Sequence, residues 1–297
     1  MAIGGGNTEK LFVDACRDEL FSHHLYRSLA SKPFVDRGIR EALLRASEDE
    51  YRHYIFWKSI VGECSDRFLR LRVFLCTLMF YLFGLTATLK YLESKERNAI
   101  EVYNEVARLR PDLREAVEKI AADEDRHETE FISGIDEARV RYIGAITLGI
   151  SDALVELTGI YTGSLGAFES ALSAGLAGLL AGIAASISMG IASYAQARNE
   201  GRARPGIVAL YTSLSYIAVA LLLALPYFIV SSILAAFVAM VVAAIAVVAY
   251  MTFYVAVLHS RSYAKEFTET ALLIFGVSLL LYILGSVLGE VFGVRPV

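Results

Sequence analysis

Hydrophobic and polar positions divide this chain into two parts with different patterns. Residues 7–138 hold most of the charged side chains in stretches with helical patterning, whereas residues 142–297 consist largely of Ala, Leu, Ile, Val, Gly, Ser and Tyr. No alternating strand pattern bounded by turn residues occurs, so the pattern predicts an all-α fold. The expected organisation is a flexible N-terminus at residues 1–6, a four-helix domain at residues 7–138 and a membrane domain of five helices at residues 139–297.

Prolines predict where the helices end. A proline inside a helix costs roughly 3 kcal/mol, so Pro33, Pro111, Pro205 and Pro226 are expected between elements. The helices of the charged part then cover about residues 9–31, 36–61, 86–109 and 112–138. An apolar segment at residues 68–89 separates the second from the third. At roughly 16 residues it is short for a membrane span of about 20, which favours a core or interfacial crossover helix over a sixth span.

The second part contains five apolar stretches that can each cross a hydrocarbon layer of about 30 Å. They cover about residues 142–163, 171–197, 207–225, 227–257 and 267–292. Arginine or lysine residues lie before the first stretch, after the second and after the fourth, while the opposite loops contain neither. The positive-inside rule therefore places the N-terminal domain in the cytoplasm and the C-terminus outside.

Composition narrows the class of protein further. Hydrophobic residues make up 56% of the 297 residues and the mean hydropathy is +0.50, which is high for a soluble protein. A net charge of -4 without a basic stripe argues against a nucleic-acid partner. Cys16, Cys64 and Cys76 have no C-x-x-C spacing, so we expect reduced, structural thiols.

The charged part contains two E-x-x-H motifs, one in its second predicted helix and one in its fourth. This spacing puts a carboxylate and an imidazole on one helical face. A single motif on a solvated face would be unremarkable, but the first and third helices add further glutamates, and together they give the di-iron carboxylate pattern of a helix bundle. The candidate metal ligands are Glu19, Glu50, His53, Glu93, Glu96, Glu124 and His127.

Residues 8–138 resemble the rubrerythrin-type ferritin-like domains through these motifs and through E-L-F-S-H-H-L-Y and L-E-S-K-E-R-N-A-I-E-V-Y. The resemblance implies a ferritin-like four-helix bundle with a di-iron centre held by the residues above, Glu93 being a further carboxylate available to one iron. It also implies Tyr26 and Tyr103 as hydrogen-bond partners of the ligands. Rubredoxin-type cysteine pairs are missing, which argues against an electron-transfer peroxidase.

Acidic side chains occur inside the first predicted span. Asp152 lies about ten residues into it, near mid-bilayer at about 1.5 Å of rise per residue, and Glu156 lies one turn further. An acid there costs roughly 2.5 to 3.5 kcal/mol, which favours a transport pathway, although a pair of structural acids between helices stays open.

Small residues recur every fourth position in the second span, at Gly178, Gly182, Ser186 and Gly190, which predicts close approach of another helix. Met189 beside them is either apolar filler or a soft metal ligand.

Residues 142–297 resemble the vacuolar iron transporter, or Ccc1-like, family through G-I-S-D-A-L-V-E-L-T-G and I-S-M-G-I-A-S-Y. The resemblance implies proton-coupled export of Fe²⁺ or Mn²⁺ from the cytosol by a homodimer, with Asp152 and Met189 in the pathway; Glu156 is added from its spacing. Both resemblances together are typical of membrane-bound ferritin-like transporters of bacteria and archaea, which implies an integral protein of the prokaryotic plasma membrane.

The loop between the second and third spans, R-N-E-G-R-A-R-P-G, lacks the glutamate-rich region of plant members. We therefore expect the N-terminal domain to capture or sense the metal. Two alternatives stay open: a membrane-anchored ferroxidase or peroxidase with the di-iron site as catalytic centre, and a domain whose metal occupancy gates transport. The sequence does not distinguish Fe²⁺ from Mn²⁺.

Overall fold

The computed structural model describes the backbone of residues 5–135, 137–168 and 170–291. Within these ranges it describes all side chains except those of residues 5–9, 93–102, 104, 105, 107, 109, 132, 133, 166, 167, 281, 282, 284–286 and 288–291. The chain divides into two compact units, unit 1 at Met1–Glu137 and unit 2 at Ala138–Val297. All regular structure in the described backbone is helical, which confirms the predicted all-α fold for this part of the chain.

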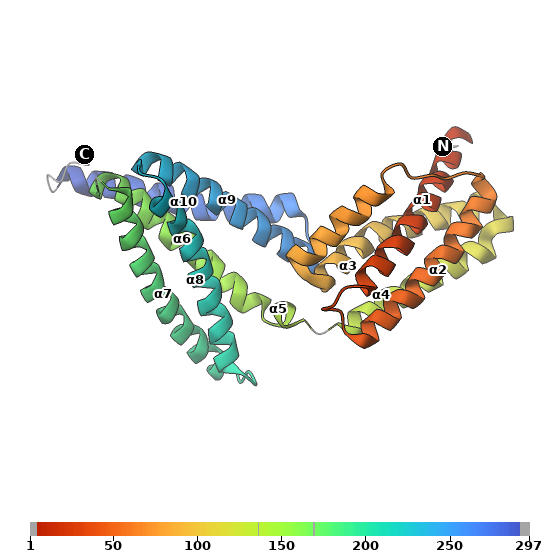
Figure 1. The fold of residues 1–297 in the computed structure, drawn as a ribbon, viewed down its shortest axis with the longest axis horizontal. Coiled ribbons are helices and arrows are strands. Elements are labelled where there is room, and N and C mark those ends of the chain that lie inside the picture. Colours follow the sequence, from red (N-terminus) through yellow and green to blue (C-terminus); the bar gives the residue numbers. More distant parts are fainter. Residues whose placement is uncertain (1–4, 136, 169, 292–297) are drawn as a thin grey trace. The chain divides into compact units, whose positions relative to one another are not determined.

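Unit 1 contains four long helices (Figure 1). They are α1 (Gly5–Ala30), α2 (Arg37–Val61), α3 (Leu69–Leu109) and α4 (Arg114–Gly134), with the short 3₁₀ helix η1 (Pro111–Leu113) before α4. Of the segment expected to be flexible, residues 5 and 6 belong to α1 and residues 1–4 lie outside the described backbone. α4 ends at Gly134 rather than at residue 138, because Ile135 adopts an extended conformation (φ -99°, ψ 117°).

A kink at Gly84 divides α3 into two segments. Gly84 has φ 86° and ψ 175°, a conformation that side chains with a Cβ disfavour. The N–H groups of Leu85 and Thr86, which begin the second segment, donate to the Glu137 carboxylate at 3.0 and 3.3 Å. The apolar segment is therefore joined to the third predicted helix and turns at the glycine. We call residues 69–83 the crossover helix.

The four helices of unit 1 enclose a common interior, since α1 and α4 each pack against both α2 and α3. One apolar cluster includes Leu25 and Leu43, and a second includes Cys16 and Trp57. Glu19 lies between them along α1, because Cys16 precedes it and Leu25 follows it. Acidic side chains are thus flanked on both sides by apolar packing.

The expectation of reduced thiols is wrong for two of the three cysteines. Cys16 of α1 and Cys64, in the loop after α2, form a disulfide with a Cα–Cα distance of 6.2 Å. The loop places Cys64 in the buried cluster that contains Trp57, next to Cys16. The spacing rules used on the sequence detect cysteines close in the chain, whereas these two are 48 residues apart. Cys76 is not part of the disulfide.

Unit 2 begins with the short α5 (Ala138–Arg141) and continues with five long helices (Figure 1). They are α6 (Ile143–Ala167), α7 (Ala171–Asn199), α8 (Pro205–Ile229), α9 (Ile233–Leu258) and α10 (Tyr263–Val291). α6 contacts each of the other four, so the helix that carries Asp152 and Glu156 is the central element of the unit.

The helix boundary predicted at Pro226 is wrong, because α8 continues through this residue to Ile229. A proline removes one backbone hydrogen bond. Tyr227, however, is only 1% exposed, and its ring stacks on that of Tyr161 at 4.5 Å. This packing stabilises the last turn of the helix beyond the proline.

Five helices in the described part of the chain are long and apolar enough to cross a membrane. Four of them, at Ile143–Leu165, Ala171–Asn199, Pro205–Ile229 and Ile233–Leu258, coincide with predicted spans. The fifth is Leu69–Leu92 with 24 residues, so the expectation that this apolar segment is too short is wrong. The predicted span at residues 267–292 falls on α10 and lies partly outside the described residues.

The small residues of α7 form a buried face, as predicted. A Cβ added to Gly178 would meet the Tyr161 ring of α6, and one added to Gly182 would meet Ala220 of α8. α7 therefore packs closely on two neighbours, which is a structural role.

Candidate metal centre

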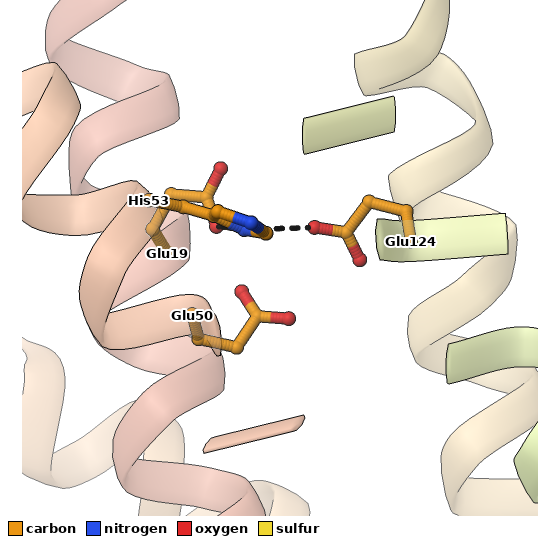
Figure 2. Close-up of side chains that lie close together, drawn as sticks. All are labelled: Glu19, Glu50, His53 and Glu124. Atoms are coloured by element: carbon orange, nitrogen blue, oxygen red, sulfur yellow. Dashed lines mark ion pairs between the residues drawn. The ribbon is translucent and has the colours of Figure 1, made fainter. Parts of the chain in front are cut away.

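Four buried side chains from three helices converge in the interior of unit 1. Glu19 of α1, Glu50 and His53 of α2, and Glu124 of α4 each offer one ligand atom, and these atoms all lie within 4.8 Å of one another. Figure 2 shows Glu124 reaching across from its helix toward the other three. This group could hold a metal ion, as predicted for these four residues.

The carboxylates of this group lie in a dry environment. Glu19, Glu50 and Glu124 are 3%, 1% and 8% exposed. Carboxylates removed from water and placed together are unfavourable unless positive charge compensates them. The group therefore requires protons or a cation.

The His53 ring faces acidic side chains at both of its nitrogens. Its Nε2 donates to Asp123 Oδ2 at 3.2 Å. Its Nδ1 lies 3.4 Å from Glu19 Oε2 and 3.5 Å from Glu124 Oε1. The nitrogen that points into the site thus faces two of the candidate ligands.

His127 of α4 repeats this arrangement. Its Nε2 donates to Asp49 Oδ2 at 3.0 Å, and its Nδ1 lies 3.5 Å from Glu50 Oε1 and 3.6 Å from Glu124 Oε2. Glu124 therefore presents one oxygen to each of the two imidazoles. Its carboxylate therefore faces both rings.

The inward nitrogens fit a metal ion. Neither His53 Nδ1 nor His127 Nδ1 has a hydrogen-bond partner, although both are buried and face carboxylate oxygens. Because Nε2 carries the proton that is donated to aspartate, the neutral ring directs a lone pair from Nδ1 toward the carboxylates. Only a proton or a cation between these atoms makes the arrangement favourable, and a nitrogen ligand held by an outer aspartate is a common feature of metal sites.

In the metal-free protein, protons can lie between the imidazole Nδ1 atoms and the carboxylate oxygens. Burial lowers the pKa of His53, but its interactions with Glu124 and Glu19 outweigh burial and raise the pKa to about 10. Burial also opposes charge on His127, yet Glu124 and Asp49 raise its pKa. The pKa of Glu124 is lowered, since the two imidazolium groups outweigh its burial.

Asp49 and Asp123 are functional candidates that the sequence analysis missed. Arg126 forms ion pairs with Asp49 at 2.7 Å and with Asp123 at 2.6 Å, and Arg52 pairs with Asp49. The signal was present, because each E-x-x-H motif belongs to a longer repeat, D-E-x-R-H, at residues 49–53 and 123–127. The aspartate preceding each glutamate orients the imidazole of the other motif.

Glu19 accepts two further hydrogen bonds, both to its Oε1. Tyr103 Oη donates at 2.8 Å, in the role predicted for this tyrosine, and Trp57 Nε1 donates at 3.2 Å. The Trp57 and Tyr103 rings stack with centroids 5.8 Å apart. Trp57 was not predicted, since the sequence gives no sign that its indole reaches the site. Tyr26 lies in the apolar core with its ring 5.4 Å from that of Phe131.

Two predicted ligands fall outside the described side chains. Glu93 and Glu96 belong to α3 by their backbone, but their side chains are not described. The structure therefore brings together Glu19, Glu50, His53, Glu124 and His127 of the predicted set.

The predicted pathway residues lie in unit 2. Glu156 Oε2 accepts a hydrogen bond of 2.6 Å from Tyr216 Oη of α8, a partner that the sequence analysis missed. Asp152, one turn before it, is half-buried, and half-buried Met189 packs against the apolar core. Glu156 thus has a polar partner within unit 2.

Replacing Asp123 by asparagine is expected to weaken metal binding by about 10- to 100-fold, the effect typical of losing an outer partner of a histidine ligand. Asp49→Asn is expected to have an effect of similar size, since Asp49 makes the equivalent contact to His127. Anaerobic titration with Fe²⁺ measures both affinities. Glu118→Gln, at an exposed position of α4, is the control and should bind like the unmodified protein.

Comparison of the chain with models of known protein families, with curated proteins and with solved structures finds no match. Any functional assignment thus depends on the residues themselves.

Proposed function

We propose that unit 1 binds a pair of divalent transition-metal ions and that unit 2 exports Fe²⁺ or Mn²⁺ from the cytoplasm in exchange for protons. The observation that carries this proposal is the convergence of Glu19, Glu50, His53 and Glu124 within 4.8 Å inside unit 1, in a chain whose unit 2 has four candidate spans among its described residues. The resemblance to ferritin-like domains and to vacuolar iron transporters supports it.

The ligand set suits iron or manganese. Carboxylates suit Mn²⁺, and imidazole suits iron among other transition metals. Glu124 lies between His53 and His127, and the remaining glutamates lie on either side of it. In this proposal the bundle captures metal in the cytosol, and the protein acts as a homodimer in a prokaryotic plasma membrane.

Transport is assigned to α6 of unit 2. Asp152 and Glu156 occupy one face of a candidate span, and Tyr216 donates to Glu156. Carboxylates that hold either metal or protons exchange one for the other as they face the two sides of a membrane, which couples the two fluxes. Met189 contributes a thioether, a soft ligand that favours a transition metal over Mg²⁺ or Ca²⁺.

Reconstitution in liposomes tests the transport part of this proposal. Fe²⁺ is placed on one side of the bilayer under anaerobic conditions, and a pH gradient is applied. We expect the Fe²⁺ flux to be faster when protons can flow down their gradient in the opposite direction, and slower when the gradient is reversed. Flux that is the same with and without the gradient would contradict proton exchange. Flux no greater than that of protein-free liposomes would contradict transport.

Metal binding to unit 1 is expected to release protons. Because the raised pKa of His53, about 10, keeps its ring protonated at neutral pH, an arriving ion must displace at least one proton. Affinity for Mn²⁺ should therefore rise about tenfold per pH unit between pH 6 and 8 for each proton displaced. Calorimetric titration in buffers of different ionisation enthalpy counts the protons. A binding constant independent of pH would show that neutral rings already face the carboxylates.

A second candidate function is oxidation of bound Fe²⁺ by peroxide or O₂. It is favoured by Trp57 and Tyr103, two stacked, oxidisable rings that both hydrogen-bond to Glu19. Repeated turnover of peroxide by the full chain, slowed in Tyr103→Phe while Fe²⁺ affinity is retained, would support this function.

A further inference from the structure

The crossover helix exposes a continuous apolar face. Six large side chains on it are between 43% and 62% exposed: Leu71, Phe74, Leu75, Leu78, Tyr81 and Leu82. Their spacing of three or four residues places them on one side of the helix. Soluble surfaces rarely carry an apolar patch of this kind without a partner.

The opposite face of the crossover helix packs on unit 1. Phe80 belongs to the buried cluster that contains Leu25 and Leu43, and Val73 and Cys76 pack against that cluster. The helix therefore has two apolar faces, and the described side chains of unit 1 cover only one of them.

The crossover helix does not cross a membrane, although Leu69–Leu92 has the length and composition of a span. A crossing would put the helices before and after it in different compartments. Tyr103, which follows it, donates to Glu19, which precedes it, so both lie in the same compartment. The kink at Gly84 also ends the straight helix well before 24 residues.

Positive charge lies at the start of the exposed face. Arg67 and Arg70 are exposed and form no ion pair with a side chain that the structure describes, whereas Arg72 is paired with Asp18 and Asp66. Arginines beside an apolar helix face are typical of helices that lie in the interface of an anionic membrane.

The linker between the two units is short, so unit 1 stays close to any bilayer that unit 2 spans. Only residues 135–142 lie between the end of α4 and the start of α6, the first candidate span of unit 2. Eight residues extend at most about 27 Å. A surface held at this distance has a high effective concentration, so even weak contacts are populated.

We propose that the crossover helix lies in the headgroup layer of the bilayer, parallel to its plane, with the six apolar side chains in the acyl region and Arg67 and Arg70 beside anionic headgroups. This proposal requires that unit 2 spans a membrane, but it does not require transport. It assigns unit 1 a second attachment to the bilayer besides the chain connection.

Tryptophan quenching in nanodiscs tests the proposal with the full chain. Leu78→Trp places a probe on the apolar face, Leu180→Trp places one on the exposed side of α7, and Glu118→Trp places one on an exposed, polar part of α4. Native Trp57 is fully buried and gives a constant background. Acyl chains carrying bromine should quench the probes at positions 78 and 180 and leave the probe at position 118 unchanged.

Other outcomes overturn the proposal in distinguishable ways. If position 180 is quenched and position 78 is open to aqueous iodide, unit 2 is in the membrane but the crossover helix is not. If position 78 is shielded from both iodide and bromine, a protein surface rather than lipid covers the face. If position 180 is not quenched, the membrane assignment of unit 2 fails first.

A charge reversal separates headgroup attraction from apolar contact. In the double variant Arg67→Glu and Arg70→Glu, quenching at position 78 should decrease in nanodiscs with anionic lipids and change little in neutral ones. If anionic nanodiscs quench position 78 equally with and without the two arginines, the proposed attraction of Arg67 and Arg70 to anionic headgroups is wrong.

Discussion

Glu124→Gln is expected to weaken metal binding by about 100-fold or more, beyond the 10- to 100-fold that loss of an outer partner causes. Glutamine keeps the shape of the side chain and removes its charge. Because Glu124 presents one oxygen to His53 and the other to His127, the substitution removes the negative charge that faces both imidazoles. Anaerobic titration with Fe²⁺ or Mn²⁺ measures the loss.

Asp125→Asn provides the matched control for this substitution. Asp125 is the next residue on α4 and is exposed, so the variant makes the same chemical change outside the site. It should retain the affinity of the unmodified chain. If Glu124→Gln bound as tightly as Asp125→Asn, the buried carboxylates would not be a metal site.

Asp152→Asn is expected to reduce the initial rate of Fe²⁺ transport by roughly 100-fold, because loss of about 2.7 kcal/mol of ion stabilisation changes a rate by that factor. Asparagine matches aspartate in size, so the packing of α6 is retained. The substitution removes the charge that holds metal or proton in the span. Liposomes loaded with an iron-sensitive dye report the rate.

Glu269→Gln is the control for transport, since Glu269 is exposed near the start of α10. It should transport at the rate of the unmodified chain. Equal rates for Asp152→Asn and Glu269→Gln would place the pathway elsewhere. Retained metal binding in both variants would show that unit 1 is unaffected.

The sequence predicted the helices and much of the site, because both depend on local spacing. The E-x-x-H motifs place a carboxylate and an imidazole one turn apart in any helix, so Glu50, His53, Glu124 and His127 could be identified without a fold. Glu19 required the assumption of a bundle, and the structure places it at the same site.

The remaining features depend on contacts between distant segments. Asp49 contacts His127 across 78 residues of sequence. The D-E-x-R-H repeat singles out this aspartate, but only the fold shows that it contacts the imidazole of the other motif. The disulfide between Cys16 and Cys64 depends equally on tertiary packing. Pro226 was taken as a helix end because a proline is unfavourable in isolation, and the buried ring of Tyr227 reverses that preference.

The apolar character of the crossover also affects how the chain is synthesised. Residues 69–92 leave the ribosome before α4 does, and they match a span in length and composition. If the translocon inserted them, His127 would emerge on the far side of the membrane and could never meet Glu50. If unit 2 spans a membrane, the packing of Phe80 on side chains of α1 and α2, both complete before this segment is, opposes such an insertion. The contact would then serve the topology of the chain as well as the stability of unit 1.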